Sequence, residues 1–218
     1  MSAPTVGCWE RLKRLGRYLV GRTRSVQLFA YQSEASRVHV YTDSDFAGCT
    51  KSRKSSSGGV VMLGKSVVKT WSSNQSVIAL SSGEAEYYAL VKGASQGIGI
   101  RNILEDIGVE GIERVQVLSD ASAAIGIASR RGSGKVRHIE VNQLWLQGKV
   151  LTGDIEVTKI GTGDNLADAL TKHVESEILV KHMKGLGMWI ESGRHVLMPE
   201  VAEQAQEFTE DPNDDDGE

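Results

Sequence analysis

A stretch of eight residues, 38–45, constrains the fold more than any other part of the sequence. β-Branched residues alternate along it with residues of other types: Val38, His39, Val40, Tyr41, Thr42 and Asp43. A period of two with valine, tyrosine and threonine predicts a β-strand. The last of these side chains is an acid, and a carboxylate buried at the end of a strand is unfavourable unless other groups compensate its charge. The position of Asp43 therefore predicts a site that other parts of the chain complete.

Acids occur at comparable positions elsewhere in the chain. Asp120 ends a second predicted strand, 115–120, while Glu84 and Glu86 open a long predicted helix and Asp168 opens a short one. Strand ends and helix starts can face a common rim, where four carboxylates would repel one another without a cation. A hard divalent ion such as Mg²⁺ prefers oxygen ligands. Two such ions flanking a phosphate provide the two-metal route of phosphodiester cleavage, so these acids predict such a site.

Length and composition exclude several classes of protein. A chain of 218 residues predicts one domain with extensions. It contains no run of 18 or more apolar residues, which indicates no membrane span. Residues 1–4 lack the apolar region of a signal peptide, so we expect an intracellular protein, in a cytoplasmic particle or the nucleus, that is not secreted. Two cysteines, Cys8 and Cys49, are too few for a disulfide framework or a zinc site.

The net charge of −3 conceals an uneven distribution. Nine of the 28 acids lie in residues 200–218, where no Lys or Arg occurs, so residues 1–199 carry 25 basic and 19 acidic side chains. We predict that the acidic tail is disordered. A mildly basic body suits an anionic partner, although many domains carry such a charge.

The first half of the chain predicts a helix and three antiparallel strands. Residues 9–20 have the pattern of a basic amphipathic helix, whose simplest interpretation is a packing helix with a solvated face. A polar loop is predicted over 48–59. Apolar runs at 60–63 and 66–71 then flank the turn Gly64-Lys65, which is typical of a β-hairpin.

The second half predicts strands that alternate with helices. Ser81 and Glu84 fit a capping box, with Ser81 as the N-cap and Glu84 reaching back to it, at the start of a long helix. Gly93, Gly97 and Gly99 weaken that helix. Alternation of strands and helices implies parallel pairing with right-handed crossovers, and hence a mixed sheet. The later elements are predicted at 114–119, 121–129, 139–151, 155–160 and 166–172.

Six motifs that occur in one order resemble a known family. They lie at 42–48, 71–73, 81–87, 119–123, 137–141 and 165–172. Together they are similar to the ribonuclease H domain at the C-terminal end of copia-type retrotransposon polyproteins, over about residues 38–173. Residues 11–20 also resemble the segment that links the reverse transcriptase of such a polyprotein to its ribonuclease H. The resemblance implies an α/β, ribonuclease H-like fold, with a five-stranded mixed sheet of three antiparallel and then two parallel strands, flanked by helices.

The resemblance also implies how the chain divides. The predicted parts are a basic helix and connection from the reverse transcriptase side (1–36), the ribonuclease H-like domain (37–174), a C-terminal helix and extension (175–199) and the acidic tail (200–218).

The activity implied by the resemblance is hydrolysis of the RNA strand of RNA–DNA hybrids, with two Mg²⁺ or Mn²⁺ ions, during retrotransposon reverse transcription. The implied partners are the hybrid and the reverse transcriptase portion of the same polyprotein. The catalytic and metal-binding acids of the family carry over onto Asp43, Glu86, Asp120 and Asp168. Asp43 would bridge both ions, Glu86 and Asp120 would bind one, and Asp168 the other. Glu86 is preferred to Glu84 because Glu84 already has a capping role, but the helical wheel does not decide between them.

One departure concerns the loop 159–165, which contains no His where many cellular and retroviral relatives have one; copia-type members are likewise without it. Proton transfer to the leaving group would then fall to metal-bound water or to another group. His138 lies elsewhere, at the predicted start of a helix, and is interpreted as a structural residue because a catalytic base needs to reach the reacting proton.

Substrate contacts are predicted from polar and basic side chains near the acids, since shape and the 2′-hydroxyl distinguish RNA from DNA. The candidates are Ser55, Ser56, Asn74, Gln75, Arg130, Arg131, Lys135 and Arg137. The basic residues could equally be solvated. Two other functions remain open: a resolvase-like or integrase-like enzyme on the same fold, and a non-catalytic nucleic-acid-binding module.

Overall fold

The computed structural model of the chain describes residues 3–33, 35–132, 134, 138–139, 143–193 and 195–197. The predicted disordered tail, 200–218, and two predicted substrate contacts, Lys135 and Arg137, lie outside the described residues. The chain divides into two compact units, Met1–Arg24 with Ile190–Glu218, and Ser25–Trp189. The domain boundaries drawn from the resemblance stay a prediction.

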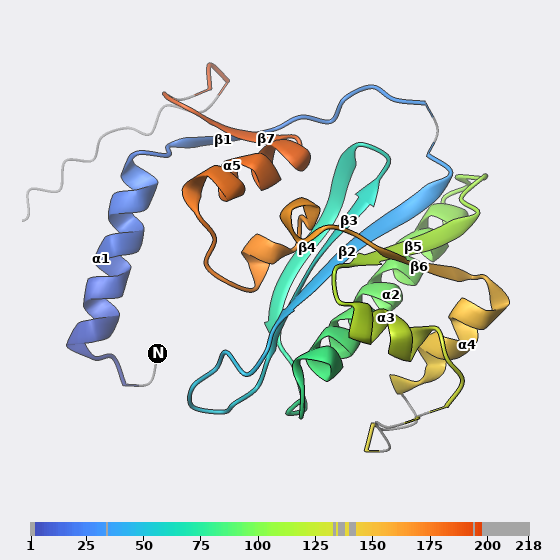
Figure 1. Cartoon of the computed structure of the whole chain (residues 1–218). Helices are drawn as coiled ribbons and strands as arrows, with labels where there is room; N and C mark the ends of the chain where they lie inside the picture. Colours follow the sequence, from blue (N-terminus) through green and yellow to red (C-terminus); the bar gives the residue numbers. More distant parts are fainter. Residues whose placement is uncertain are drawn as a thin grey trace, which may run out of the picture. The chain divides into compact units, whose positions relative to one another are not determined.

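The larger unit contains a five-stranded sheet in the order β4-β3-β2-β5-β6 (Figure 1). β2 pairs antiparallel with β3, which pairs antiparallel with β4, while β5 pairs parallel with both β2 and β6. This arrangement confirms the predicted five-stranded mixed sheet of three antiparallel and then two parallel strands. The strands are β2 (Arg37–Asp45), β3 (Ser56–Leu63), β4 (Ser66–Asn74), β5 (Arg114–Ser119) and β6 (Ile155–Lys159).

The predicted loop over 48–59 is wrong in its last four residues, because β3 begins at Ser56. Small residues fill this part of the strand, so the sequence shows no apolar alternation there. The strand forms nonetheless because its backbone pairs on both sides: Gly58 lies opposite Asp43 of β2 and opposite Ser72 of β4.

The main core lies between one face of the sheet and three helices: α2 (Ser82–Asp106), α3 (Ser122–Ala128) and α4 (Trp145–Thr152). Val40 and Val117 of the sheet and Leu90 of α2 are fully buried there. Gly93 of α2 faces the sheet, where an added Cβ would lie 2.3 Å from Cγ2 of Thr42. The glycine that lowers helix propensity therefore lets α2 approach β2 closely.

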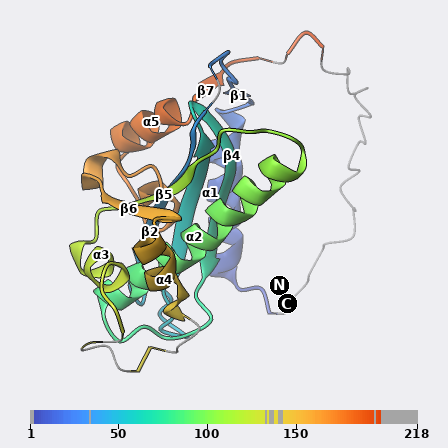
Figure 2. The same cartoon turned by 90° about the vertical axis from the view of Figure 1, so that its right-hand side faces the viewer.

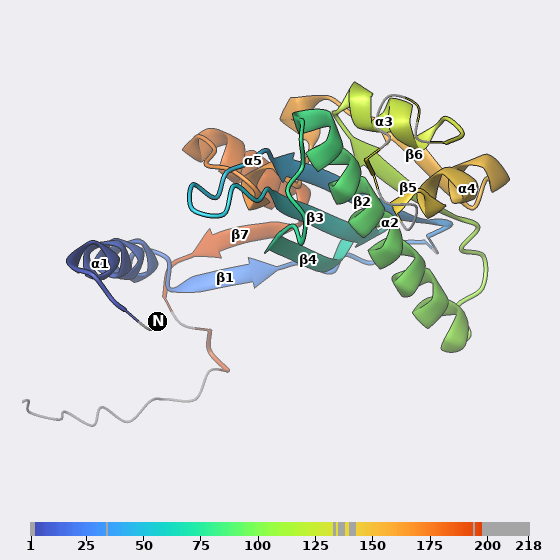
Figure 3. The ribbon, with the colours of Figure 1, turned by 90° about the horizontal axis from the view of Figure 1, so that it is seen from below.

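The opposite face of the sheet carries a second, smaller core. Val60 and Met62 of β3 and Leu186 pack there with partly buried neighbours, among them Tyr41. The covering elements are the 3₁₀ turns η2 (Thr162–Asp164) and η3 (Asp168–Leu170) and the helix α5 (Ser176–Gly185). The sheet lies between α2 and α5, as Figures 2 and 3 show.

The remaining elements are the helix α1 (Val6–Val20) and the strands β1 (Arg24–Gln27) and β7 (Met188–Glu191), which pair in a separate two-stranded sheet. Thr5 caps α1, since its side chain accepts a hydrogen bond from the backbone N–H of Cys8. In the part of the chain that the structure describes, no helix combines the length and the apolar character needed to cross a membrane.

Two local predictions need correction. The helix predicted over 139–151 begins only at Trp145, and Ile139 lies outside it; 140–142 fall outside the described residues. The hydroxyl of Tyr87 donates a 2.7 Å hydrogen bond to the Gln143 carbonyl, so this carbonyl has a partner without helix formation. The segment predicted as a helix over 166–172 is a 3₁₀ turn of three residues.

The predicted capping box forms only in part. The Ser81 hydroxyl accepts the backbone N–H of Glu84 at 3.2 Å, as predicted. The Glu84 carboxylate does not return to Ser81 but accepts the N–H of Leu80 at 3.0 Å. Its other hydrogen bonds, to Tyr88 and His138, fix the carboxylate in that direction.

Candidate active site

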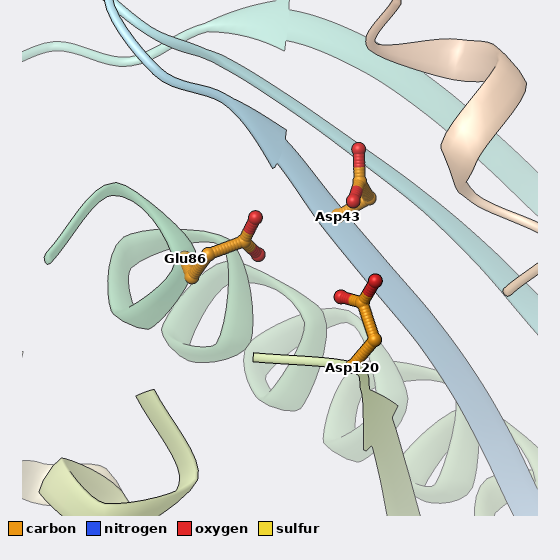
Figure 4. Close-up of side chains that lie close together, drawn as sticks. All are labelled: Asp43, Glu86 and Asp120. Atoms are coloured by element: carbon orange, nitrogen blue, oxygen red, sulfur yellow. The ribbon is translucent and has the colours of Figure 1, made fainter. Parts of the chain in front are cut away.

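Three acids from distant parts of the chain meet at one edge of the sheet (Figure 4). Asp43 lies near the end of β2, Asp120 directly follows β5, and Glu86 lies in the first turns of α2. One carboxylate oxygen from each lies within 4.8 Å of the others. The two aspartates meet because β2 and β5 are adjacent parallel strands, whose carboxyl ends lie at the same edge.

The fourth predicted acid, Asp168, is not part of this group of three but lies beside it on η3. It is 6% exposed, and its Oδ1 forms a 2.5 Å ion pair with Nζ of Lys172. The same ammonium lies 4.0 Å from Oδ1 of Asp43. The hydroxyl of Thr171 donates a hydrogen bond to the other oxygen of Asp43. Lys172 thus links the carboxylates of Asp168 and Asp43.

Two residues bring η3 close to Asp43. Asn165 is fully buried; its Nδ2 donates to the Thr42 carbonyl at 2.9 Å, and its Oδ1 accepts the N–H of Ala167 at 3.2 Å. Gly58 lies opposite Asp43 in the sheet. A Cβ on Gly58 would lie only 2.7 Å from Cγ2 of Thr171, so the glycine makes room for η3.

We therefore expect Gly58→Ala to displace η3 and to lower both stability and any activity that depends on Asp168. Overpacking of this kind typically costs about 1–3 kcal/mol. The matched control is Gly126→Ala in α3, where the added Cβ would meet no atom within 4 Å beyond its chain neighbours and the helix's own backbone, and where helix propensity favours alanine by up to about 1 kcal/mol. Urea unfolding of both variants measures the effect. Equal stabilities would show that close approach at Gly58 is unimportant.

The electrostatics of the cluster favour a cation. Burial raises the pKa of Asp43 to about 6; Thr171 and Lys172 oppose the rise, and Asp168 and Asp120 add to it. Burial, followed by repulsion from Asp43 and Asp120, raises the pKa of Glu86 to about 8, against a hydrogen bond from the N–H of Ser44. Near neutral pH the cluster therefore retains a proton or requires a compensating positive charge.

The donor set fits a hard divalent ion. All three groups offer carboxylate oxygens, which Mg²⁺ and Mn²⁺ prefer. Oε2 of Glu86 is buried and has no hydrogen-bond partner among the described residues, while Oε1 accepts the N–H of Ser44 at 3.3 Å. A buried oxygen without a partner in a cluster of like charges is a natural ligand position.

Glu84, the other candidate on α2, lies outside the group of three acids and makes different contacts. It is 1% exposed, and its carboxylate accepts hydrogen bonds from the Tyr88 hydroxyl and the Leu80 N–H and contacts Nε2 of His138 at 2.7 Å. Burial raises the pKa of Glu84, but the hydrogen bonds from His138 and Tyr88 outweigh it and leave the pKa lowered. His138 was predicted at the start of a helix, but it lies in a turn. Its described contact is with Glu84.

The predicted substrate contacts lie in different environments. Ser55 is buried and its hydroxyl accepts the Ala47 N–H at 3.0 Å. Gln75 is buried and donates to the Ser57 hydroxyl and the Ala85 carbonyl. Ser56 and Asn74 pair with each other at the open ends of β3 and β4, and Arg130 and Arg131 follow α3. Their contacts with a substrate stay a prediction.

The sequence analysis assigned no role to three residues of the site, although all three lie in the motif 165–172: Asn165, Thr171 and Lys172. A signal for Lys172 was available, because it stands four residues after Asp168, and opposite charges at that spacing lie close together on a helical turn. Nothing in the sequence indicated the hydrogen bond from Asn165 to β2.

Several curated proteins similar to the chain are polyproteins of plant transposons. The chain is 33% identical over 167 residues to the retrovirus-related Pol polyprotein from transposon TNT 1-94 of Nicotiana tabacum. It is 31% identical over 173 residues to the one from transposon RE2 of Arabidopsis thaliana. These matches cover 76% and 79% of this chain but 12% of each polyprotein, so the chain spans about one eighth of their length.

Among solved structures, the N-terminal RNase H domain of a Mycobacterium tuberculosis protein, fused to maltose-binding protein, is 19% identical with a TM-score of 0.45. The match covers 70% of this chain and 98% of that chain. No protein-family model matches the sequence. The sequence relatives of the chain are thus retrovirus-related Pol polyproteins of plant transposons, which it matches over about three quarters of its own length.

Proposed function

We propose that this chain is a metal-dependent endonuclease that hydrolyses the RNA strand of RNA–DNA hybrids during reverse transcription of a copia-type retrotransposon. The observation that carries the proposal is the convergence of Asp43, Glu86 and Asp120 at one edge of a ribonuclease H-like sheet. The similarity to retrovirus-related Pol polyproteins supports it, and it implies as partners the hybrid and the reverse transcriptase portion of the same polyprotein. An intracellular place of action stays a prediction.

Asp43, Glu86 and Asp120 would hold one divalent ion, and Asp43 with Asp168 a second. When bound, Mg²⁺ or Mn²⁺ ions in such a pair stabilise the negative charge on a phosphate and lower the pKa of a bound water. Asp43 is suited to a shared position, since it lies between the other two acids of the cluster on one side and the Asp168–Lys172 pair on the other.

Lys172 places a positive charge beside these acids. Its ammonium contacts Asp168 and approaches Asp43, and its side chain remains 45% exposed. An ion held by Asp43 and Asp168 would compete with this ammonium, which can turn towards solvent. The hydroxyl of Thr171 donates a hydrogen bond to one oxygen of Asp43 and would hold that oxygen in place.

The test is a comparison of three labelled substrates, an RNA–DNA hybrid, duplex RNA and duplex DNA, each with Mg²⁺ and with excess chelator. The proposal predicts Mg²⁺-dependent cleavage of the RNA strand of the hybrid alone. Cleavage or joining of duplex DNA would instead favour a resolvase-like or integrase-like enzyme. Tight binding of the hybrid without cleavage would favour a non-catalytic module.

Binding of the hybrid should weaken steeply as salt is raised, if the basic residues after α3 contact phosphates. We expect Arg131→Gln to make the slope of log affinity against log salt shallower by about one. Arg114→Gln is the matched control, because Arg114 begins β5 and Asp120 follows its far end. Fluorescence anisotropy at several salt concentrations measures both slopes. An unchanged slope for Arg131→Gln would place Arg131 outside the interface.

A further inference from the structure

A cavity of about 530 Å³ lies on the face of the sheet opposite α2, within the unit Ser25–Trp189. α5, the sheet and residues near Leu28 surround it. Tyr41, Met62 and Leu166 give it largely apolar walls. None of the four predicted catalytic acids lines it, so the nuclease proposal leaves this cavity without a role.

His182 of α5 lines this cavity and is 2% exposed. Neither Nδ1 nor Nε2 of its ring has a hydrogen-bond partner among the described residues. Buried polar atoms in folded proteins nearly always have such partners, and an imidazole has two nitrogens to satisfy. An aromatic ring buried only for packing would not need these nitrogens. The pair of unsatisfied atoms therefore points to a polar group that enters the cavity from outside the chain.

The charged groups around the cavity are mostly basic. They are Lys65, Lys181, Lys184 and a single acid, Asp164. Nζ of Lys181 is already occupied, since it binds Oδ1 of Asp164 at 2.8 Å and the Gly163 carbonyl at 2.6 Å. Lys65 and Lys184 have no ion-pair partner in the described part of the chain. After the internal pair is set aside, the rim offers two positive charges to a ligand.

We propose that this cavity binds a small anion that carries a flat aromatic ring. The ring would lie against Tyr41 and Met62, a polar atom of the ligand would satisfy His182, and the anionic group would lie near Lys65 and Lys184. Nucleoside monophosphates and aromatic carboxylates share this chemistry. The inference does not depend on the nuclease activity, since it uses none of the acids of the candidate active site.

The test is an NMR titration of the full chain, in which the imidazole signals are followed and that of His182 is identified from the variant His182→Gln. The probes are adenosine 5′-monophosphate and, separately, 1-naphthoate. We expect at least one of them to shift the His182 signal saturably below about 10 mM. Adenosine lacks the anionic group and inorganic phosphate lacks the ring, so each should bind at least about 10-fold more weakly.

Lys184→Gln provides a second variant at an exposed position that should leave folding intact. It should weaken binding of the probe about 3- to 5-fold, whereas Lys69→Gln, on the exposed side of β4, should leave the affinity unchanged. A response to the nucleotide alone would show that the cavity accepts nucleoside monophosphates, and a response to the naphthoate alone would show that it accepts aromatic carboxylates. No shift with either probe, equal binding of inorganic phosphate, or equal losses in the two lysine variants would overturn the proposal. Hybrid cleavage should be the same in Lys184→Gln as in the wild type.

Discussion

Replacing Glu86 by Gln is expected to lower the rate of Mg²⁺-dependent hybrid cleavage by at least about 100-fold, whereas replacing Glu84 by Gln should lower it less than about 10-fold. The two residues stand two positions apart on the same helix, yet only Glu86 shares the cluster with Asp43 and Asp120. The Gln side chain keeps the size of Glu but removes the charge that would hold a divalent ion. Single-turnover cleavage at saturating hybrid measures both rates.

The Glu84→Gln variant should differ in another property. Glu84 is buried and accepts three contacts, from Leu80, Tyr88 and His138, so its replacement should cost about 1–3 kcal/mol of stability. Glu86→Gln should show no such loss. If Glu84→Gln instead abolished cleavage at full stability, and Glu86→Gln retained it, the choice of Glu86 as a ligand would be wrong.

The second large effect concerns stability without metal. The pKa of Asp43 (about 6) and that of Glu86 (about 8) in the folded protein lie above the ordinary values for these acids, so the folded protein binds more protons than the unfolded chain. The stability that protonation confers is fully present below about pH 4 and is lost as the pH rises to about 8. We expect the free energy of unfolding of the metal-free protein to fall by on the order of 3 kcal/mol across this window.

Mg²⁺ should reverse this loss, because it compensates the ionised carboxylates. At about pH 8 and a Mg²⁺ concentration about 100 times the Kd, the melting temperature should rise by about 5–10 °C, and the rise should be smaller near pH 5. Glu86→Gln is the control, since in metal-free buffer at about pH 8 it should be more stable than the wild type. A wild-type melting temperature that is independent of both pH and Mg²⁺ would contradict the repulsion inferred for this cluster.

The sequence was sufficient to predict the sheet and most of the acidic cluster. The alternation at 38–45 and the apolar run at 114–119 each predict one strand. If these strands are parallel neighbours, the acids at their carboxyl ends, Asp43 and Asp120, come together, and no other part of the sequence is needed for that prediction. The choice of Glu86 over Glu84 depended on the capping role assigned to Glu84, because helical geometry alone did not separate the two residues.

Other parts of the site depend on contacts that no local pattern encodes. The start of β3 is determined by pairing of small residues with β2 and β4, not by apolar alternation. The place of Asp168 depends on the long-range hydrogen bond from Asn165 to Thr42 and on the space left at Gly58. Asp168 forms an ion pair with Lys172 and lies outside the close group, so three carboxylates form that group where four were predicted to converge.

The most direct test of the account is a crystal of the protein soaked in Mn²⁺ and measured at a wavelength where manganese scatters anomalously. The account predicts an anomalous peak about 2.0–2.3 Å from one carboxylate oxygen each of Asp43, Glu86 and Asp120, and no peak there in crystals of Asp43→Asn. A fully soaked crystal whose manganese peaks all lie away from these three side chains would contradict it.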